Sequence, residues 1–112
     1  MRMRRVLSAA VLSAATVAPV VLTASPGHAV TTHTWERLAR CESGGRWHIN
    51  TGNGYYGGLQ ISPSTWRAYG GRRFAALPHR ATKREQITVA TRIKRGQGWG
   101  AWPACSARIG VR

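Results

Sequence analysis

Apolar residues with helical spacing predict a helix in the first half of the chain. The positions i, i+3, i+4 and i+7 of this segment share one helix face and are Trp35, Leu38, Ala39 and Glu42. We expect Thr34 to cap the helix and residues 43–45, Ser-Gly-Gly, to end it, because glycine readily adopts the left-handed conformation that closes a helix. The predicted helix therefore carries a carboxylic acid on its apolar face.

The segment that follows this helix is rich in Gly, Asn and Tyr. Its Asn53-Gly54 pair is typical of a hairpin turn, so a short β-ribbon is expected within residues 47–61. Residues 62–63, Ser-Pro, then have the pattern of an N-cap followed by proline at the first helical position. They predict a short helix that carries Trp66 and Tyr69 and is ended by the two glycines after it.

A third helix is predicted by a capping box at residues 82–85, Thr-Lys-Arg-Glu, in which the first and last side chains bond each other's backbone N–H groups. We expect this helix to end at Gly96. Its apolar face consists of Ile87, Val89, Ala90 and Ile93. Together the segments predict an α+β domain that is mainly helical with a short β-ribbon.

The first 29 residues have the features of a secretory signal peptide. Three arginines precede the apolar run Val6–Leu22, and Gly27-His28-Ala29 supplies the small residues that a signal peptidase needs. An uncleaved membrane anchor is the alternative, but the run is at the lower limit for a span and no basic stop-transfer cluster follows. We therefore expect a signal peptide at 1–29, a secreted domain at 30–112, and no further module.

The composition limits the chemistry that this chain can perform. It has 112 residues, with 17 Lys and Arg against three acidic residues, all of them Glu. The lack of Asp excludes EF-hand loops, aspartate dyads and a Ser-His-Asp triad. Three arginines and no acids fall within residues 1–29, so residues 30–112 carry a net charge of +11. This basic surface is expected to attract anionic wall polymers.

The two cysteines, Cys41 and Cys105, are expected to form one disulfide. An even number of cysteines in a small exported domain is typical of a covalent staple, which adds to the limited stability of a small core. A catalytic thiol is the alternative, but it requires a reduced cysteine and a base, and export disfavours the reduced form.

The three glutamates are separated by their predicted positions. Glu85 belongs to the capping box, and Glu36 lies near the start of its helix, where a negative charge meets the positive end of the helix dipole. Glu42 lies on an apolar stripe in the last helical turn, where burial and the dipole both raise its pKa, unless cations such as Arg40 or Arg46 lower it. A protonated carboxylic acid is what a general acid at a glycosidic bond requires. A side chain turned to solvent is the alternative for Glu42.

Several contiguous motifs resemble the resuscitation-promoting factor domain over nearly all of residues 34–110. These motifs are Trp35 to Gly45, Ile49 to Gln60, Ser64-Thr65-Trp66, Thr82 to Ile87, and Gln97 to Cys105. The resemblance implies a compact lysozyme-like domain, secreted by actinobacteria, that cleaves peptidoglycan glycan strands. It also implies that Cys41 and Cys105 pair with each other.

Site residues follow from the same resemblance. Glu42 matches the catalytic glutamate of the family. Substrate-binding positions in the cleft-forming motifs are Asn53, Tyr56, Gln60, Thr65 and Trp66. Tyr55 and Tyr56 are flat aromatics suited to stacking on sugars, with ordinary cross-strand packing as the alternative. Two departures from the family pattern are Ser62, where many members have Asp, and Arg46, where Asn is common; the first removes a possible helper carboxylate.

A mechanism with one acid fits the helix geometry better than one with two. Glu36 and Glu42 are separated by about 9 Å of helical rise and by about 120° around the axis, so they point to different sides. In lytic transglycosylases, which the family resembles, one Glu protonates the glycosidic oxygen and then acts as base for the muramic 6-hydroxyl. The product is a 1,6-anhydro sugar.

Other functions follow from the same composition. A wall-glycan-binding module without turnover is the main alternative, because basic charge and aromatic residues would suffice for it. Nucleic-acid binding is suggested by charge and Trp content, but export and the lack of a recognisable motif disfavour it. His33, His48 and His79 have no metal-ligand spacing, so we expect neither a metal nor another cofactor. The expected protein is a monomer, and a partner wall hydrolase is a further expectation.

Overall fold

The fold was analysed in a computed structural model, which describes residues 30–112. The predicted signal peptide therefore lies outside the described residues. The α-helices are α1 (Thr32–Ser43), α2 (Pro63–Ala68), α3 (Lys83–Gln97) and α4 (Pro103–Arg108), with short 3₁₀ turns at Gly71–Arg73, Pro78–Arg80 and Gly98–Ala101. Within residues 30–112, no helix is both long enough and apolar enough to span a lipid bilayer.

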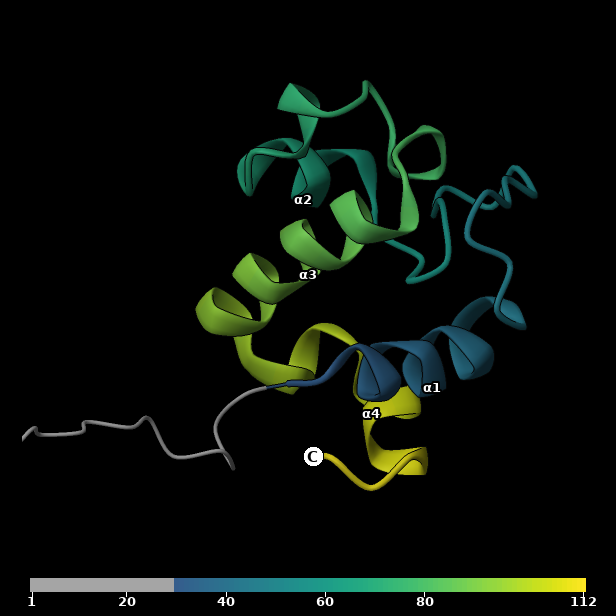
Figure 1. Cartoon of the computed structure of the whole chain (residues 1–112), viewed down its shortest axis with the longest axis vertical. Coiled ribbons are helices and arrows are strands. Elements are labelled where there is room, and N and C mark those ends of the chain that lie inside the picture. The colour runs from purple at the N-terminus through teal and green to yellow at the C-terminus, as the bar shows by residue number, and fades with distance from the viewer. Residues whose placement is uncertain (1–29) are drawn as a thin grey trace, which may run out of the picture.

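The helices enclose one aromatic-rich core. Helices α1 and α4 pack against each other at one end of the domain, α3 crosses beside them, and α2 lies at the other end (Figure 1). Trp35 of α1 contacts Trp99 and Trp102, with ring centroids 5.4 Å away in each case. Further fully buried side chains come from α1, α2, α3 and the loop before α2. They include Leu38, Leu59, Trp66, Val89 and Ile93.

Helix α1 begins earlier than the sequence pattern predicted. Its N-cap is Thr31, whose hydroxyl accepts a hydrogen bond from the backbone N–H of Thr34 at 3.2 Å. The predicted cap at Thr34 was wrong because several threonines precede Trp35 and each is a good capping residue. The predicted end is confirmed, since Gly44 has φ +71° and its N–H bonds the carbonyl of Arg40.

The predicted starts of α2 and α3 are confirmed, whereas α4 was not predicted from the sequence. Ser62 caps α2, and the Thr82–Glu85 capping box opens α3 with both reciprocal bonds formed. Helix α3 ends at Gln97, so the end predicted at Gly96 was wrong. Gly96 lies inside the helix because Tyr69 packs on it; a Cβ there would come within 2.5 Å of the Tyr69 hydroxyl.

The predicted β-ribbon is absent from the described part of the chain. Residues 47–61 contain isolated antiparallel bridges only, which join Tyr56 to Asn50 and to Ile61. Left-handed backbone at Gly52, Gly54 and Gly57 bends this segment every few residues, so a ladder of strand pairs cannot extend. The α+β prediction was therefore wrong, and the described residues form a small, mainly helical domain.

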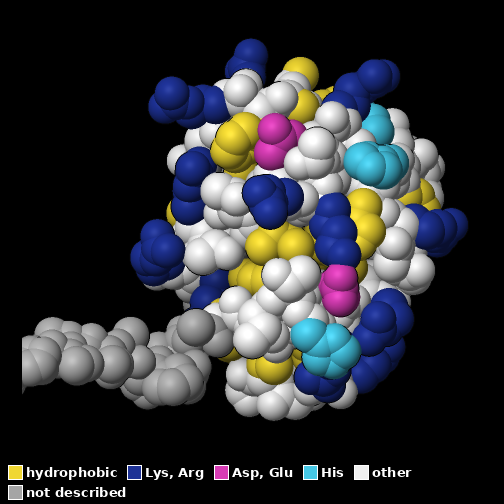
Figure 2. Space-filling view, in the orientation of Figure 1, with side chains coloured by type: hydrophobic (Ala, Val, Ile, Leu, Met, Phe, Trp, Pro, Cys, Tyr) yellow, Lys and Arg dark blue, Asp and Glu magenta, His cyan; other side chains and the backbone are white. Residues whose placement is uncertain are grey.

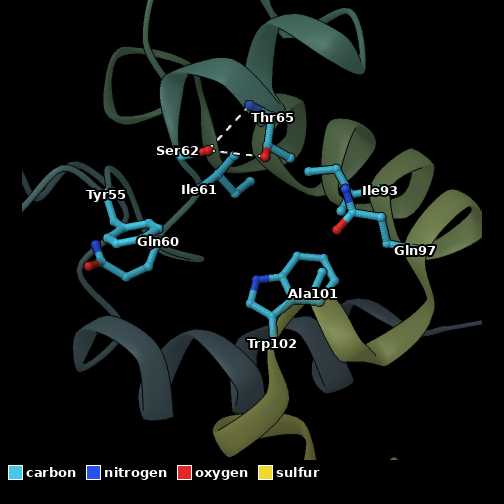
Figure 3. A pocket seen from close by; sticks show the side chains of 9 residues that line it. All are labelled: Tyr55, Gln60, Ile61, Ser62, Thr65, Ile93, Gln97, Ala101 and Trp102. Carbon is cyan, nitrogen blue, oxygen red and sulfur yellow. Dashed lines mark hydrogen bonds between the residues drawn. The ribbon is translucent and has the colours of Figure 1, made fainter.

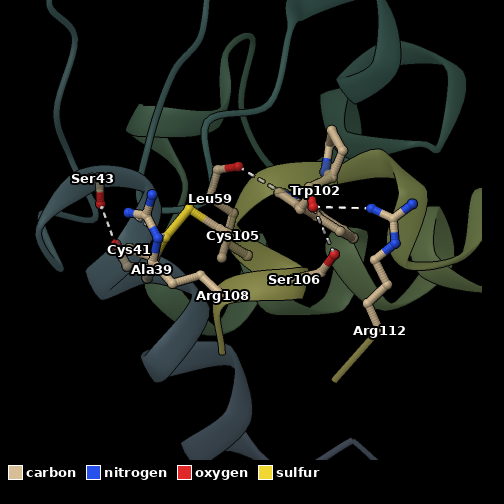
Figure 4. The surroundings of a disulfide bond; sticks show 10 residues. Ala39, Cys41, Ser43, Leu59, Trp102, Cys105, Ser106, Arg108 and Arg112 are labelled. Carbon is tan, nitrogen blue, oxygen red and sulfur yellow. Dashed lines mark hydrogen bonds between the residues drawn. A yellow bond between two sulfur atoms is a disulfide. The ribbon is translucent and has the colours of Figure 1, made fainter. Parts of the chain in front are cut away.

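The predicted disulfide is confirmed. Cys41 in the last turns of α1 is bonded to Cys105 in α4, with their Cα atoms 5.7 Å apart (Figure 4). No cysteine of the described residues is free. The bond fixes the end of α1 to α4. Glu42 directly follows Cys41, so it lies in the part of α1 that the bond holds.

Candidate active site

A groove of about 330 Å³ lies beside the last turn of α1. It is bounded by α1, by the loop before α2 and by the start of α4, and its lining residues are Glu42, Tyr55, Gln60, Ala101, Trp102, Pro103, Ala104 and Cys105. A smaller hollow of about 70 Å³ continues it, since the two share Tyr55, Gln60, Ala101 and Trp102. Figure 3 shows this hollow between the tyrosine-bearing loop, α2 and the end of α3. Because they share these lining residues, the two hollows adjoin, and together we call them the channel.

Glu42 is half-buried in the wall of this groove. Burial raises the pKa of its carboxyl above the ordinary value, since a partly dehydrated carboxylate is harder to ionise. Within residues 30–112 it has no ion-pair partner. The guanidinium of Arg46, which could have lowered the pKa, instead donates its Nε–H to the Ser43 carbonyl at 2.8 Å. Glu42 therefore holds its proton more readily than a fully exposed carboxyl group does.

The other two glutamates have structural partners. Glu36 forms an ion pair with Lys83 of α3, and the hydrogen bond and charge of that lysine lower the pKa of Glu36. The helix-start explanation for Glu36 was wrong, because α1 begins at Thr32 and has no acid in its first turn. Glu85 accepts the Thr82 backbone N–H at 2.9 Å, as the capping box predicted. Within residues 30–112, Glu42 is the one carboxylate that lines the groove.

Two of the five predicted substrate-binding residues line the groove or its extension, and a third is hydrogen-bonded to one of them. Gln60 lines both hollows, and Thr65 lines the smaller one. Asn53 is exposed and donates its side-chain amide to Gln60 Oε1 at 3.2 Å, so it supports Gln60 from the solvent side. The backbone of Gln60 is left-handed at φ +52°, a conformation that costs free energy for a residue with a side chain and is common at functional sites.

The other two predicted residues lie elsewhere. Trp66 is 0% exposed and donates its indole N–H to the Ala75 carbonyl at 2.8 Å, which places it in the core and not in the groove. Tyr56 stacks on His79 with ring centroids 5.2 Å apart and lines neither hollow. Its neighbour Tyr55 is 50% exposed and lines the groove instead.

The substrate-binding residues predicted from the sequence do not include several groove residues. Trp102, Gln97 and Ala101 line the groove or its extension, and so does Tyr55. The alternation of adjacent side chains along extended backbone could have indicated that only one of the two tyrosines faces a given side. Nothing in the local pattern separates Trp102 from Trp66, because which indole borders the groove depends on packing between distant segments.

Ser62 has a local structural role. Its hydroxyl accepts the Thr65 backbone N–H at 3.3 Å and bonds the Thr65 hydroxyl at 3.0 Å (Figure 3). It thereby caps α2 and orients Thr65 at the smaller hollow. A serine can cap the helix and orient Thr65 without adding a second charge to the groove.

Residues 30–112 contain no group of three or more His, Cys, Asp or Glu that could hold a metal ion. His48 donates Nδ1–H to the His79 carbonyl at 2.8 Å, and burial is the largest cause that lowers the pKa of His79. His48 and His79 thus hold the segment after α1 against the turn before α3, and neither lines the groove.

Sequence comparisons place this chain among known proteins. The family described as a transglycosylase-like domain matches residues 29–105. The chain is similar to resuscitation-promoting factor Rpf1 of Corynebacterium glutamicum, with 66% identity over 69% of this chain and 40% of that protein. It is similar to resuscitation-promoting factor Rpf of Micrococcus luteus, with 53% identity over 78% of this chain and 38% of that protein.

A third relative is matched along more of its length. It is resuscitation-promoting factor RpfC of Mycobacterium tuberculosis, with 42% identity over 94% of this chain and 73% of that protein. The chain spans less than half of the Corynebacterium and Micrococcus relatives, at 40% and 38%.

Proposed function

Because the chain belongs to the resuscitation-promoting factor (transglycosylase-like) family, we propose that it cleaves peptidoglycan glycan strands at the β-1,4 bond between N-acetylmuramic acid and N-acetylglucosamine. The observation that carries the proposal is the setting of Glu42. It is the groove's carboxyl group, its pKa is raised by burial, and no cation of the described residues pairs with it. These are the properties of a general acid for a glycosidic oxygen.

The proposed reaction is a lytic transglycosylation that uses Glu42 twice. Protonated Glu42 gives its proton to the glycosidic oxygen as the bond from that oxygen to the muramic C1 breaks. The N-acetyl group of the substrate stabilises the positive charge that develops at C1. The Glu42 carboxylate then takes the proton of the muramic 6-hydroxyl as its oxygen bonds C1, which closes the 1,6-anhydro ring and restores the acid.

The groove residues have binding roles in this proposal. Tyr55 offers a flat face for sugar stacking, and the amide of Gln60 and the hydroxyl of Thr65 are suited to bond sugar hydroxyl and acetamide groups. Asn53 holds Gln60, whereas Trp66 and Tyr56 support the groove walls from behind. The fold is proposed to be lysozyme-like, with the channel in the place of the glycan cleft.

The cellular setting is also a proposal. The first 29 residues are proposed to be a cleaved signal peptide, and the mature domain to act as a secreted monomer at the cell wall, with a partner wall hydrolase. Lys and Arg side chains are spread over the face seen in Figure 2 with few acidic groups among them, which supports retention by anionic wall polymers. The relatives are named resuscitation-promoting factors, and promotion of resuscitation or growth of dormant cells is proposed for this chain too.

The test is release of soluble muropeptides from purified peptidoglycan by wild type, E42Q, E36Q and E85Q. E42Q keeps the shape of the side chain but cannot supply the proton, so release is expected to fall by about 10²-fold or more. The other two variants control for the loss of a charge, and circular dichroism checks that all four chains fold. Wild-type release by folded E42Q would refute the enzyme. Products one water heavier than the anhydro sugars would replace the transglycosylase by a hydrolase.

A wall-glycan-binding module without turnover is the second candidate. It is favoured by the exposed Tyr55 at the groove and by Ser62, which is committed to capping α2 and adds no carboxylate. The same variants separate the two functions. A binding module retains its affinity for glycan in E42Q and releases no muropeptides in any variant.

A further inference from the structure

A buried glutamine of α3 forms hydrogen bonds with both ends of the loop that lines the groove. We call residues 47–60 the groove loop. Gln86 is 0% exposed, and its Nε2 donates to the Trp47 carbonyl at 2.7 Å and to the Ala81 carbonyl at 3.0 Å. Its Oε1 accepts the Gly58 N–H at 3.0 Å. One side chain thus joins the two ends of the groove loop to each other and to the segment before α3.

The loop residues pack closely against the side chain of Gln86. A Cβ on Gly57 would lie 2.6 Å from Gln86 Oε1, so glycine is required there both by this contact and by its φ of +81°. Two residues later, the carbonyl of Leu59 accepts a hydrogen bond from the indole N–H of Trp102 at 2.9 Å (Figure 4). The backbone just before Gln60 is therefore held from α3 on one side and from the start of α4 on the other.

The held segment leads directly into the groove. Gln60 follows Leu59 and has a left-handed backbone conformation. Its side-chain Nε2–H donates to the Gly57 carbonyl at 3.1 Å. Tyr55 lies within the loop that Gln86 closes, and both Tyr55 and Gln60 line the groove opposite Glu42. Gln86 itself lines neither hollow, so any effect on a ligand must pass through the loop.

We propose that Gln86 is a positioning residue for the glycan-binding groove, which fixes Tyr55 and Gln60 at the distance from Glu42 that the bound strand requires. This inference rests on the proposed function only in that the groove binds glycan. A buried amide with three partners could also serve stability alone, as buried polar groups must be satisfied wherever they occur. The two roles differ in what a variant does to ligand affinity while the domain remains folded.

The test measures the affinity of an N-acetylglucosamine tetrasaccharide by calorimetry, with E42Q as the parent so that no turnover occurs. Q86M keeps the size of the side chain and removes its three hydrogen bonds. V89A, on the same buried face of α3, is the matched control because Val89 is fully buried and makes none of these bonds. Both are assayed below the temperature at which either unfolds. We expect the dissociation constant to rise about tenfold in Q86M and to stay within about twofold of the parent in V89A.

A second variant gives a readout that stability alone would not move. In Q86E, the protonated acid can accept from Gly58 and donate to one carbonyl, whereas the ionised form cannot donate. The affinity of the Q86E chain for the glycan should therefore recover as pH falls. The affinity of the E42Q parent should not show this recovery. The backbone amide signals of Tyr55 and Gln60 in NMR spectra should shift in Q86M and not in V89A.

Equal affinity in parent and folded Q86M, or unshifted signals at Tyr55 and Gln60, would overturn the proposal. Because affinity needs no catalysis, its outcome is separate from that of the proposed reaction. A domain that binds glycan without cleaving it would still show the Q86M effect.

Discussion

Replacement of both cysteines by alanine should lower the free energy of unfolding by about 4 kcal/mol. The bond between Cys41 and Cys105 closes a loop with a sequence separation of 64 residues. In the chain-entropy model a loop of that size removes about 14.5 cal/mol/K from the unfolded state, or about 4 kcal/mol at 25 °C. Cys105 is 8% exposed, so loss of its buried sulfur adds a small packing cost.

That loss is large relative to the total stability of the domain. At about 0.05–0.15 kcal/mol per residue, the described domain of about 83 residues would have about 4–12 kcal/mol in all. The double variant C41A/C105A should therefore be marginally folded. Its helices should still pack natively where it folds, because Trp35 of α1 contacts Trp102 beside α4 without the disulfide. Activity per folded molecule should accordingly be close to that of the wild type.

The assay is urea unfolding followed by tryptophan fluorescence, which reports on the cluster of Trp35, Trp99 and Trp102. Muropeptide release is measured in parallel and divided by the folded fraction. A difference in unfolding free energy below about 1 kcal/mol at equal m-value would refute the loop-closure reasoning. Full stability loss with no activity in the remaining folded molecules would show that the bond also positions Glu42.

The remaining predictions concern charge and capping. Because the folded pKa of Glu42 is raised above 4.5, the stability that its proton provides is present below that pH and lost as pH rises through the folded pKa. E42Q should therefore unfold at higher urea than wild type at neutral pH, with no difference in acid. T82A should cost about 1 kcal/mol, seen in the urea midpoint, and should leave release per folded molecule unchanged. E36Q should lower stability only slightly, and about 0.5 M salt (roughly three times physiological ionic strength) should remove the difference, because the Glu36–Lys83 pair is partly exposed to solvent. Adsorption of E42Q to purified walls should fall steeply over the same salt range; constant adsorption would argue against electrostatic retention.

The local features of the chain were predictable from sequence because they depend on neighbouring residues. The period of Trp35, Leu38 and Ala39 gave α1 its buried face, and the Thr82–Glu85 capping box opens α3 as expected. The disulfide was predicted from the even cysteine count together with the expected export, and it is present. The sorting of glutamates also needed only local positions, although the partner of Glu36 turned out to be Lys83 from another helix.

The sequence by itself thus determined α1, α2 and α3, the caps at Ser62 and Thr82 and the carboxyl group on the apolar stripe, because each arises within a few residues of chain. It did not predict α4. Tertiary structure decided the groove. Only packing places Tyr55 rather than Tyr56, and Trp102 rather than Trp66, at its edge. It also turned the predicted ribbon into a bent loop, whose ends are joined by hydrogen bonds from a residue of α3. Such contacts connect segments tens of residues apart, and no local pattern encodes which distant groups will meet.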